Sequence, residues 1–154
     1  MGEITIRVFE ARDLSRILKI EGSSFGRDAW PAELFREYAS VCPKLFLVAA
    51  ASGRIAAYSI ACIRREAAEL ASIAVLPEYR GHGLATRLLK ATFRRARRQG
   101  ATSIWLMVRS DNETAVDLYR KLGFVHTSSV RRYYEDGSLG WRMRVTLSTP
   151  VQAD

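Results

Sequence analysis

The segment VLPEYRGHGLA, residues Val75–Ala85, decides the fold of this 154-residue chain. It follows an apolar stretch, and the residues after it carry apolar side chains at helical spacing. Gly81 and Gly83 allow backbone N–H groups to turn inward together, and the N-terminus of a helix adds a partial positive charge. The segment therefore predicts a turn between a strand and a helix that binds an anion such as a pyrophosphate.

Two other phosphate-binding turns fit this segment poorly. A nucleoside-triphosphatase loop carries a lysine after its last glycine, and Leu84 stands there instead. A dinucleotide-binding turn follows an early strand of a parallel sheet, and several elements precede this one. A glycine turn before a helix is also often only a tight connection, so the segment alone leaves both interpretations open.

Strands and helices are predicted on both sides of this turn. Strands are predicted from alternating apolar and polar residues, as in 4–9, or from a continuous apolar run, as in 45–51, and helical spacing such as that of Leu88, Leu89 and Ala96 predicts helices. The predicted strands are 4–9, 45–51, 55–63, 67–76, 103–109, 125–130 and 139–147, and the predicted helices are 13–22, 31–38, 83–99 and 112–122. This order predicts one α/β domain, residues 1–148, with a mixed central sheet and helices on both faces, and a short tail, 149–154.

Two motifs resemble those of the GNAT superfamily of N-acetyltransferases. Residues 80–85, RGHGLA, match the family's R/Q-x-x-G-x-G/A signature between a strand and a helix. Residues 112–124, NETAVDLYRKLGF, resemble its N-x-x-A-x-x-L-Y-x-x-x-G-F block. The resemblance is strongest over residues 66–130. It implies the GNAT fold, in which two central strands splay apart to admit the pantetheine arm of acetyl-CoA, the acetyl donor.

The resemblance also assigns donor-binding residues by position. The backbone of Ile73, Ala74 and Val75 would pair with pantetheine like an added strand. Asn112 would contact the pantetheine or phosphate arm. The pyrophosphate would be held by the main-chain amides of Arg80, Gly81, His82, Gly83, Leu84, Ala85 and Thr86.

By the same resemblance, Tyr119 would place its phenol near the thioester sulfur. A phenol can donate a hydrogen bond or a proton to the departing CoA thiolate, so Tyr119 is the predicted catalytic acid. Leu118 and Leu122 lie beside it in the sequence, which leaves a core aromatic residue as the other interpretation.

The predicted base follows from a departure from the family. Within the family, the chain most resembles the ribosomal-protein-alanine N-acetyltransferases, which act on protein N-termini. The similarity lies in residues 25–31, 105–109 and 131–134. That subgroup usually carries a glutamate where this chain has Met107, and a thioether cannot accept the amine proton. Another group must therefore serve as the base.

Glu69 is the predicted replacement base. It stands at even spacing from Ile73 on the strand before the turn, which predicts that both side chains share one face. The histone-acetyltransferase branch of the family has its glutamate base at this position, and an apolar wall including Met107 would raise the pKa of the Glu69 carboxyl group. A solvated strand glutamate is the other interpretation. Glu21 is a second candidate base, and a water chain is a third.

The residues predicted to select the acceptor are mostly aromatic: Phe25, Trp30, Met107, Tyr133 and Tyr134. Aromatic walls suit a peptide N-terminus held in a groove, such as that of a ribosomal protein or a nascent chain. Leu139, however, stands where the subgroup often has an acidic residue. Two alternatives therefore stay open, a small-molecule amine as acceptor and a non-catalytic acyl-CoA-binding sensor or interaction domain.

The composition narrows the possible partners. The chain has 24 Lys and Arg against 16 Asp and Glu, a net charge of +8, and five of these cations lie within residues 90–98. Such a field attracts polyanions, yet no aromatic stacking platform supports sequence-specific nucleic-acid binding. No apolar run is long enough to span a membrane, and residues 1–10 lack the apolar core of a signal peptide, so we do not expect export. The sequence leaves both a monomer and a homodimer open.

Cysteine usage bears on the compartment and on the mechanism. Cys42 and Cys62 are expected to be reduced thiols rather than a disulfide, and with His82 and His126 they show no metal-ligand spacing. Neither cysteine is an obvious acyl carrier. We therefore expect a cytoplasmic protein without a metal site, in which the amine attacks the thioester directly in a ternary complex.

Overall fold

The computed structural model describes residues 2–147. Within that range, seven strands form one sheet in the order β1-β2-β3-β4-β5-β7-β6. The strands are β1 (Ile4–Val8), β2 (Phe46–Ala51), β3 (Arg54–Arg64), β4 (Ala67–Val75), β5 (Ser103–Arg109), β6 (Val125–Val130) and β7 (Gly140–Thr146), and the helices are α1 (Leu14–Phe25), α2 (Ala32–Val41), α3 (Leu84–Arg98) and α4 (Glu113–Lys121). The predicted mixed sheet and order of elements are confirmed, whereas the predicted tail, 149–154, lies outside the described residues.

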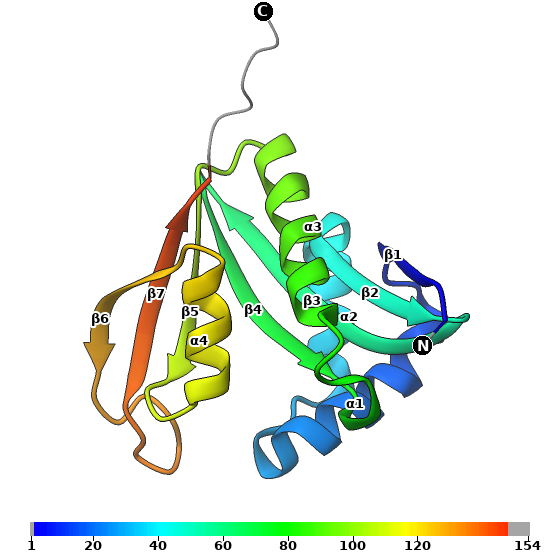
Figure 1. The fold of residues 1–154 in the computed structure, drawn as a ribbon, viewed down its shortest axis with the longest axis horizontal. Helices are drawn as coiled ribbons and strands as arrows, with labels where there is room; N and C mark the ends of the chain where they lie inside the picture. The colour runs from blue at the N-terminus through cyan, green and yellow to red at the C-terminus, as the bar shows by residue number, and fades with distance from the viewer. Residues whose placement is uncertain (1, 148–154) are drawn as a thin grey trace, which may run out of the picture.

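The sheet forks between its two central strands. β4 and β5 are parallel and pair only where Ala67–Glu69 lie beside Ser103–Trp105. Beyond these residues β4 continues beside β3, and β5 stays paired with β7 along its whole length, so the two strands diverge toward the lower end of Figure 1. The splayed central strands expected of the fold are therefore present.

Helices cover both faces of the sheet, with α3 and α4 on the near face in Figure 1 and α1 and α2 behind it. The buried side chains of α3 repeat at helical spacing: Leu84, Leu88, Leu89, Ala91, Thr92 and Ala96. β2 and most of β3 lie between the two layers and are buried on both faces. Full burial of one leucine contributes about 1.5–3 kcal/mol, which makes these strands a stable base for the fork. No helix within residues 2–147 has the length and hydropathy of a membrane span.

A β-bulge interrupts β4 beside the fork. Ile60 of β3 pairs with Ser72, and the next residue of β3, Ala61, pairs with Leu70. Ala71 is therefore an extra residue in β4 with no partner of its own in this ladder. An extra residue reverses the alternation of side chains between the two faces of the sheet.

The bulge places Glu69 and Ile73 on opposite faces. Ile73 packs against core residues of α3. Glu69 instead lies opposite Cys62 on the face covered by α2, where its charge acts on Tyr38. The prediction that Glu69 and Ile73 share one face is therefore wrong, because simple alternation holds only in a strand without a bulge.

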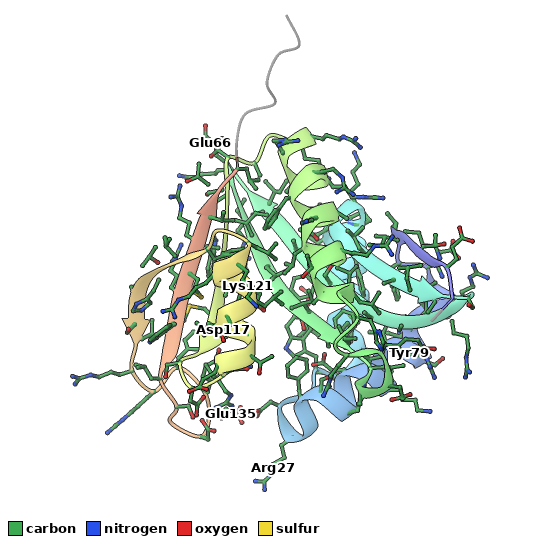
Figure 2. All side chains as sticks on the ribbon, viewed as in Figure 1. Arg27, Glu66, Tyr79, Asp117, Lys121 and Glu135 are labelled. Carbon is green, nitrogen blue, oxygen red and sulfur yellow. A yellow bond between two sulfur atoms is a disulfide. The ribbon has the colours of Figure 1, made fainter. Side chains whose placement is uncertain are left out.

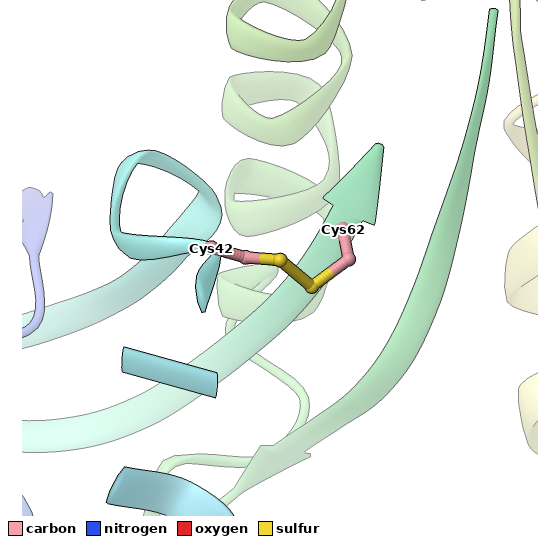
Figure 3. The surroundings of a disulfide bond; sticks show 2 residues. All are labelled: Cys42 and Cys62. Atoms are coloured by element: carbon pink, nitrogen blue, oxygen red, sulfur yellow. A yellow bond between two sulfur atoms is a disulfide. The ribbon is translucent and has the colours of Figure 1, made fainter. Parts of the chain in front are cut away.

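Cys42 and Cys62 form a disulfide that joins the end of α2 to β3 (Figure 3). Their Cα atoms lie 5.5 Å apart, although 20 residues separate them in the sequence. The expectation of reduced thiols is therefore wrong, because the return of the chain from α2 through β2 into β3 brings the two together, which sequence spacing does not reveal. The inference of a cytoplasmic compartment loses this support, since disulfides persist mainly in oxidising compartments.

Candidate active site

A cavity of about 500 Å³ lies in the fork between β4 and β5. The end of α1, the first two turns of α4 and the β6–β7 connection complete its walls. Eight of the residues singled out in the sequence line it: Glu21, Phe25, Trp30, Ile73, Met107, Asn112, Tyr119 and Tyr134. The structure therefore brings these residues together, while Glu69, Tyr133 and the turn residues 80–86 are not among its lining.

Helix α4 carries Asn112 and Tyr119 to the cavity. Asn112 is the N-cap, and its side-chain Oδ1 accepts a hydrogen bond from the Ala115 N–H at 3.2 Å. This contact satisfies one of the helix's unpaired N-terminal donors. Seven residues make about two helical turns, so Tyr119 lies on the same side of α4 as its cap. The cap thereby fixes the start of the helix that positions the phenol.

The Tyr119 phenol is held in its protonated form. Its side chain is only 7% exposed, and its ring packs edge-on against Phe124 with centroids 5.6 Å apart. Burial, and to a lesser degree the neighbouring Tyr134, raises the pKa of Tyr119 well above the ordinary tyrosine range. A protonated phenol at the cavity wall can donate a hydrogen bond to a sulfur atom placed beside it.

The turn between β4 and α3 offers several backbone donors. Gly81 and Gly83 have φ angles of +80° and +78°, which are accessible to glycine at little cost. None of the N–H groups of residues 81–86 donates to an acceptor within residues 2–147, and α3 lacks a side-chain cap. These N–H groups lie at the N-terminus of α3 and are free to bind an anionic ligand, as the sequence predicts.

Side chains around this turn add positive charge. Arg80 donates from Nε to the Val75 carbonyl at 3.0 Å and from Nη2 to the Ser24 hydroxyl at 3.3 Å, so it ties the turn to β4 and α1. Beside the turn, near Tyr79 as labelled in Figure 2, lies an open hollow of about 520 Å³. Its lining residues are Arg16, Lys19, Arg54, Glu78, Tyr79 and His82. Three cations against one carboxylate give this region a positive field.

Glu21 is a buried carboxyl group in the cavity wall. It is 1% exposed and accepts hydrogen bonds from the Tyr58 hydroxyl and from the Trp30 N–H, the latter at 2.9 Å. The Tyr58 hydroxyl also lies 3.1 Å from that of Ser72, next to the bulge. Burial raises the pKa of Glu21, and the two donors act in the opposite direction. A fixed carboxyl group with a raised pKa is suited to accept a proton from an amine.

The position of Glu21 within α1 could have identified it from the sequence. Glu21 follows Ile17 and Ile20 on the buried face of α1, where an acidic residue is unusual unless it is paired or functional. Glu69 is half-buried on the α2 face of β4. The cavity wall therefore contains Tyr119 and Glu21, and Glu69, the base predicted from the sequence, is not among its lining residues.

The outer walls of the cavity are largely aromatic. The Trp30 indole stacks on Tyr38 with centroids 5.2 Å apart and planes 9° from parallel. Tyr134 lines the cavity, whereas Tyr133 is 48% exposed. The Tyr133 ring packs edge-on against the Tyr134 ring, with the two ring centroids 4.9 Å apart. Of the two predicted tyrosines, the structure places only Tyr134 where an acceptor in the cavity would meet it.

Met107 is seated against a glycine of the neighbouring strand. A Cβ atom at Gly140 would lie 3.0 Å from the Met107 Cε and 2.9 Å from the Tyr133 Cβ. The absence of a side chain at Gly140 therefore lets Met107 and Tyr133 pack close to the backbone of β7. Met107 contributes an apolar surface to the cavity at the position where a base was missing from the sequence.

Comparisons with known proteins agree with this geometry. The sequence model of the Acetyltransferase (GNAT) family matches residues 12–124. An N-alpha-acetyltransferase of Sulfurisphaera tokodaii is 30% identical over 94% of this chain and 94% of its own.

Two solved structures are similar along nearly the whole chain. Ard1 from Thermoplasma volcanium superimposes with a TM-score of 0.90 at 27% identity, covering 94% of this chain and 98% of its own. The ribosomal-protein-S18-alanine N-acetyltransferase from Escherichia coli superimposes with a TM-score of 0.83 at 29% identity, covering 99% of each chain.

Proposed function

This chain belongs to the acetyltransferase (GNAT) family, and from that premise we propose that it acetylates the α-amine of protein or peptide N-termini. It is an N-acetyltransferase with acetyl-CoA as its donor. The finer proposal rests on one observation, a cavity in the fork whose wall contains the Glu21 carboxyl group and the Tyr119 phenol. These are the two kinds of group that transfer to an amine requires.

The names of the relatives support a protein N-terminus as the acceptor. One is an N-alpha-acetyltransferase and another is a ribosomal-protein-S18-alanine N-acetyltransferase. The aromatic wall formed by Phe25, Trp30 and Tyr134 suits the extended backbone and side chains of a peptide end. The natural acceptor in this proposal is the N-terminus of a ribosomal protein or of a nascent chain.

The donor would bind along β4 and the following turn. Beyond Glu69, β4 has no β5 residue paired with it, so its edge faces the fork. Pantetheine, which carries amide groups, can pair with the backbone of residues 73–75 as an added strand does. The N–H groups of residues 81–86 would then hold the pyrophosphate, with Asn112 on the opposite side of the arm.

The leaving group would be served by Tyr119. Attack by the amine nitrogen on the thioester carbonyl forms the N–C bond, and the C–S bond breaks when the tetrahedral intermediate collapses. The electron pair of that bond leaves with sulfur, and the Tyr119 hydroxyl donates its hydrogen bond or proton to the thiolate. The raised pKa of Tyr119 keeps this proton in place until sulfur develops charge.

The amine proton would pass to Glu21, directly or through a water molecule. Glu21 lines the cavity, and the Tyr58 hydroxyl and the Trp30 N–H fix its orientation. Glu69, the base expected from sequence spacing, lies on the α2 face of β4 and is therefore the less favourable candidate. The acceptor attacks directly in a ternary complex, since the cysteines are joined in a disulfide and neither is a thiol nucleophile.

Met107 favours one alternative, transfer to a small amine. An apolar side chain in the wall offers no charged partner for a peptide, and it leaves room for a compact acceptor. A panel of acceptors separates the two functions. It contains peptides with free N-termini, the same peptides with blocked N-termini and one internal lysine, and small primary amines and polyamines.

The test is release of the CoA thiol from acetyl-CoA with each acceptor. We expect turnover on free N-terminal peptides and little on the blocked lysine peptides. Turnover on small amines alone would overturn the peptide assignment. Tight binding of acetyl-CoA without thiol release on any acceptor would instead indicate a non-catalytic sensor domain.

A further inference from the structure

Three polar side chains from three elements form a hydrogen-bonded chain at the cavity wall: Ser72 of β4, Tyr58 of β3 and Glu21 of α1. The Tyr58 hydroxyl donates to the Glu21 Oε1 atom and lies 3.1 Å from the Ser72 Oγ atom. Ser72 and Glu21 line the cavity, whereas Tyr58 is fully buried and is not among the lining residues. The chain therefore leads from the cavity through the core and back to the carboxyl group.

The bulge at Ala71 places Ser72 within reach of Tyr58. Leu70 packs into the core on the α4 side of the sheet, whereas Ala74 packs with Tyr58 against α1. Ser72 shares a face with Ala74, because side chains alternate along a strand, and Ala74 pairs directly with Tyr58. Without the extra residue, Ser72 would share the face of Leu70 and point away from Tyr58.

The available protons fix the direction of this chain. The Tyr58 hydroxyl has one proton, which it donates to Glu21, and the Trp30 N–H donates to the other carboxylate oxygen at 2.9 Å. Tyr58 must therefore accept its second hydrogen bond from the Ser72 hydroxyl. The Ser72 Oγ atom then keeps its acceptor capacity for a donor inside the cavity.

Packing alone gives little reason for this arrangement. Phe35 and Phe46 surround the Tyr58 ring, and a phenylalanine at position 58 would need no hydroxyl partners. A carboxyl group is costly to bury even when it is hydrogen-bonded. Burial, and then the charge of Glu21, raises the pKa of Tyr58 far above the ordinary tyrosine range, so this phenol can give up its proton only while it receives another. These properties suit a relay.

We propose that Ser72 and Tyr58 relay the proton of the attacking amine to Glu21, with Ser72 as the group that contacts the amine. As the N–C bond forms, the amine proton moves to Ser72 Oγ, the Ser72 proton to Tyr58 Oη, and the Tyr58 proton to Glu21 Oε1. Both hydroxyls end neutral, and the carboxylate gains one proton, which returns to water after the product leaves. This inference rests on the proposed function and specifies the path of its amine proton.

The experiment compares Ser72→Ala, Ser72→Thr and Tyr58→Phe with the wild type, and combines Ser72→Ala with Glu21→Gln. The matched control is Ser59→Ala. Ser59 is also a buried hydroxyl, 3.5 Å from that of Thr92, and it is not among the residues that line the cavity. For each protein, kcat, the KM of acetyl-CoA and the melting temperature are measured, with the acceptor that the wild type turns over fastest.

We expect Ser72→Ala and Tyr58→Phe each to lower kcat by about 10–100-fold, because a broken relay loses a positioned path for the proton. The KM of acetyl-CoA should stay at the wild-type value. Ser72→Thr keeps the hydroxyl and should stay near the wild type, as should Ser59→Ala. Adding Ser72→Ala to Glu21→Gln should lower kcat little further, since both changes interrupt one path.

The two relay variants should differ in the pH dependence of kcat. The hydrogen bond from Tyr58 lowers the pKa of Glu21, so Tyr58→Phe should shift the loss of activity at low pH to higher pH. Ser72→Ala leaves both donors to Glu21 in place and should lower the rate without that shift. Every variant keeps the other titratable groups that line the cavity: Asp28, Arg109, Tyr119 and Tyr134.

A wild-type kcat in Ser72→Ala, independent losses in the double variant, or an equal loss in Ser59→Ala would each overturn the relay. If Glu21→Gln loses activity and Ser72→Ala does not, Glu21 receives the proton by another route, and the proposed function survives the failure of the relay. Full activity of Glu21→Gln, or a wild type that turns over no acceptor, would overturn both. Turnover of small amines alone would refute the peptide assignment and still test the relay.

Discussion

On the β4 side of the fork, buried contacts fix the groups that face the cavity, whereas on the β5 side exposed ion pairs fix the outer wall. Glu21 is held in the interior by Tyr58 and Trp30, and a disulfide secures the neighbouring helix α2 to β3. On the other side, every residue of β6 is exposed, and the β6–β7 loop is held by the ion pair of Asp136 with Arg109, the last residue of β5.

This difference suggests a division of tasks between the two walls. Proton transfer needs a group whose position and pKa do not vary from one turnover to the next, and burial supplies both. Admission and release of an acceptor need contacts that form and break readily, and exposed ion pairs supply these. Variants on each side should therefore differ in what they change as well as in how much.

The largest effect is expected on the buried wall. Glu21→Gln should lower kcat by about 10²–10³-fold, the contribution typical of a positioned general base. Because burial raises the pKa of Glu21, wild-type activity should fall as the pH drops through a value above the ordinary glutamate range, and the variant should lack this fall. Initial rates of thiol release across pH measure both.

Glu69→Gln is the matched control for that variant, and its rates should stay close to those of the wild type. The reverse result, a large loss in Glu69→Gln and a small one in Glu21→Gln, would restore Glu69 as the base. The pH dependence of stability tests the raised pKa of Glu21 independently of activity. Wild-type unfolding free energy should decrease as the pH rises through the raised pKa of Glu21, since the folded state then loses a proton that it binds more tightly than the unfolded chain does.

The second effect concerns the disulfide. Closing a loop across 20 residues restricts the unfolded chain, so the double variant Cys42→Ser, Cys62→Ser should unfold with about 3 kcal/mol less free energy than the oxidised wild type. Urea titration with and without reductant measures the difference. A reductant should shift the wild-type midpoint and leave that of the double variant in place; identical shifts in both would argue against a disulfide contribution.

A third effect separates chemistry from binding. Tyr119→Phe should lower kcat by about 10–100-fold while the KM of acetyl-CoA stays near the wild-type value, because the variant loses the hydroxyl and keeps the ring packed against Phe124. The decrease in kcat caused by Tyr119→Phe should be smaller with an acetyl donor whose leaving thiol is more acidic, because that thiolate needs less help from a proton donor. An unchanged kcat would show that Tyr119 serves packing alone.

The smallest effect is expected on the exposed wall. Asp28→Asn should change the unfolding free energy by no more than about 0.5 kcal/mol, because its exposed ion pair with Arg109 contributes little. It should nevertheless raise the peptide KM, since it releases the loop between α1 and α2, which is part of the cavity wall, from Arg109. A stability loss as large as that of the cysteine variant would remove the distinction between the two walls.

Local features of the fold follow from the sequence, and non-local ones do not. The glycine turn at residues 80–85 and the capped helix that starts after Asn112 depend only on residues that are neighbours in the sequence. The type and order of these elements can therefore be predicted. The bulge at Ala71 arises from pairing between two strands, and it reversed the face inferred for Glu69. The pairing of Cys42 with Cys62 likewise depends on the path of the chain through β2.

The candidate site divides in the same way. Tyr119 follows from a motif within one helix, and its place in the cavity wall agrees with that motif. Glu21 left a weaker signal, an acidic residue among the buried positions of α1. The ion pairs that Arg109 makes with Asp28 and Asp136 have no sequence signature, because these partners are 81 residues before it and 27 after it.

The edge of β4 that faces the fork has a consequence for the lifetime of the protein. Backbone amides on an edge without a partner strand exchange their hydrogens with water more readily than those inside a sheet. We expect acetyl-CoA to slow exchange along residues 71–75 and to raise resistance to proteolysis, by about 2.7 kcal/mol of stabilisation when the donor is at a hundred times its dissociation constant. The cellular supply of acetyl-CoA would then set how long each copy of the enzyme survives, as well as how fast it works.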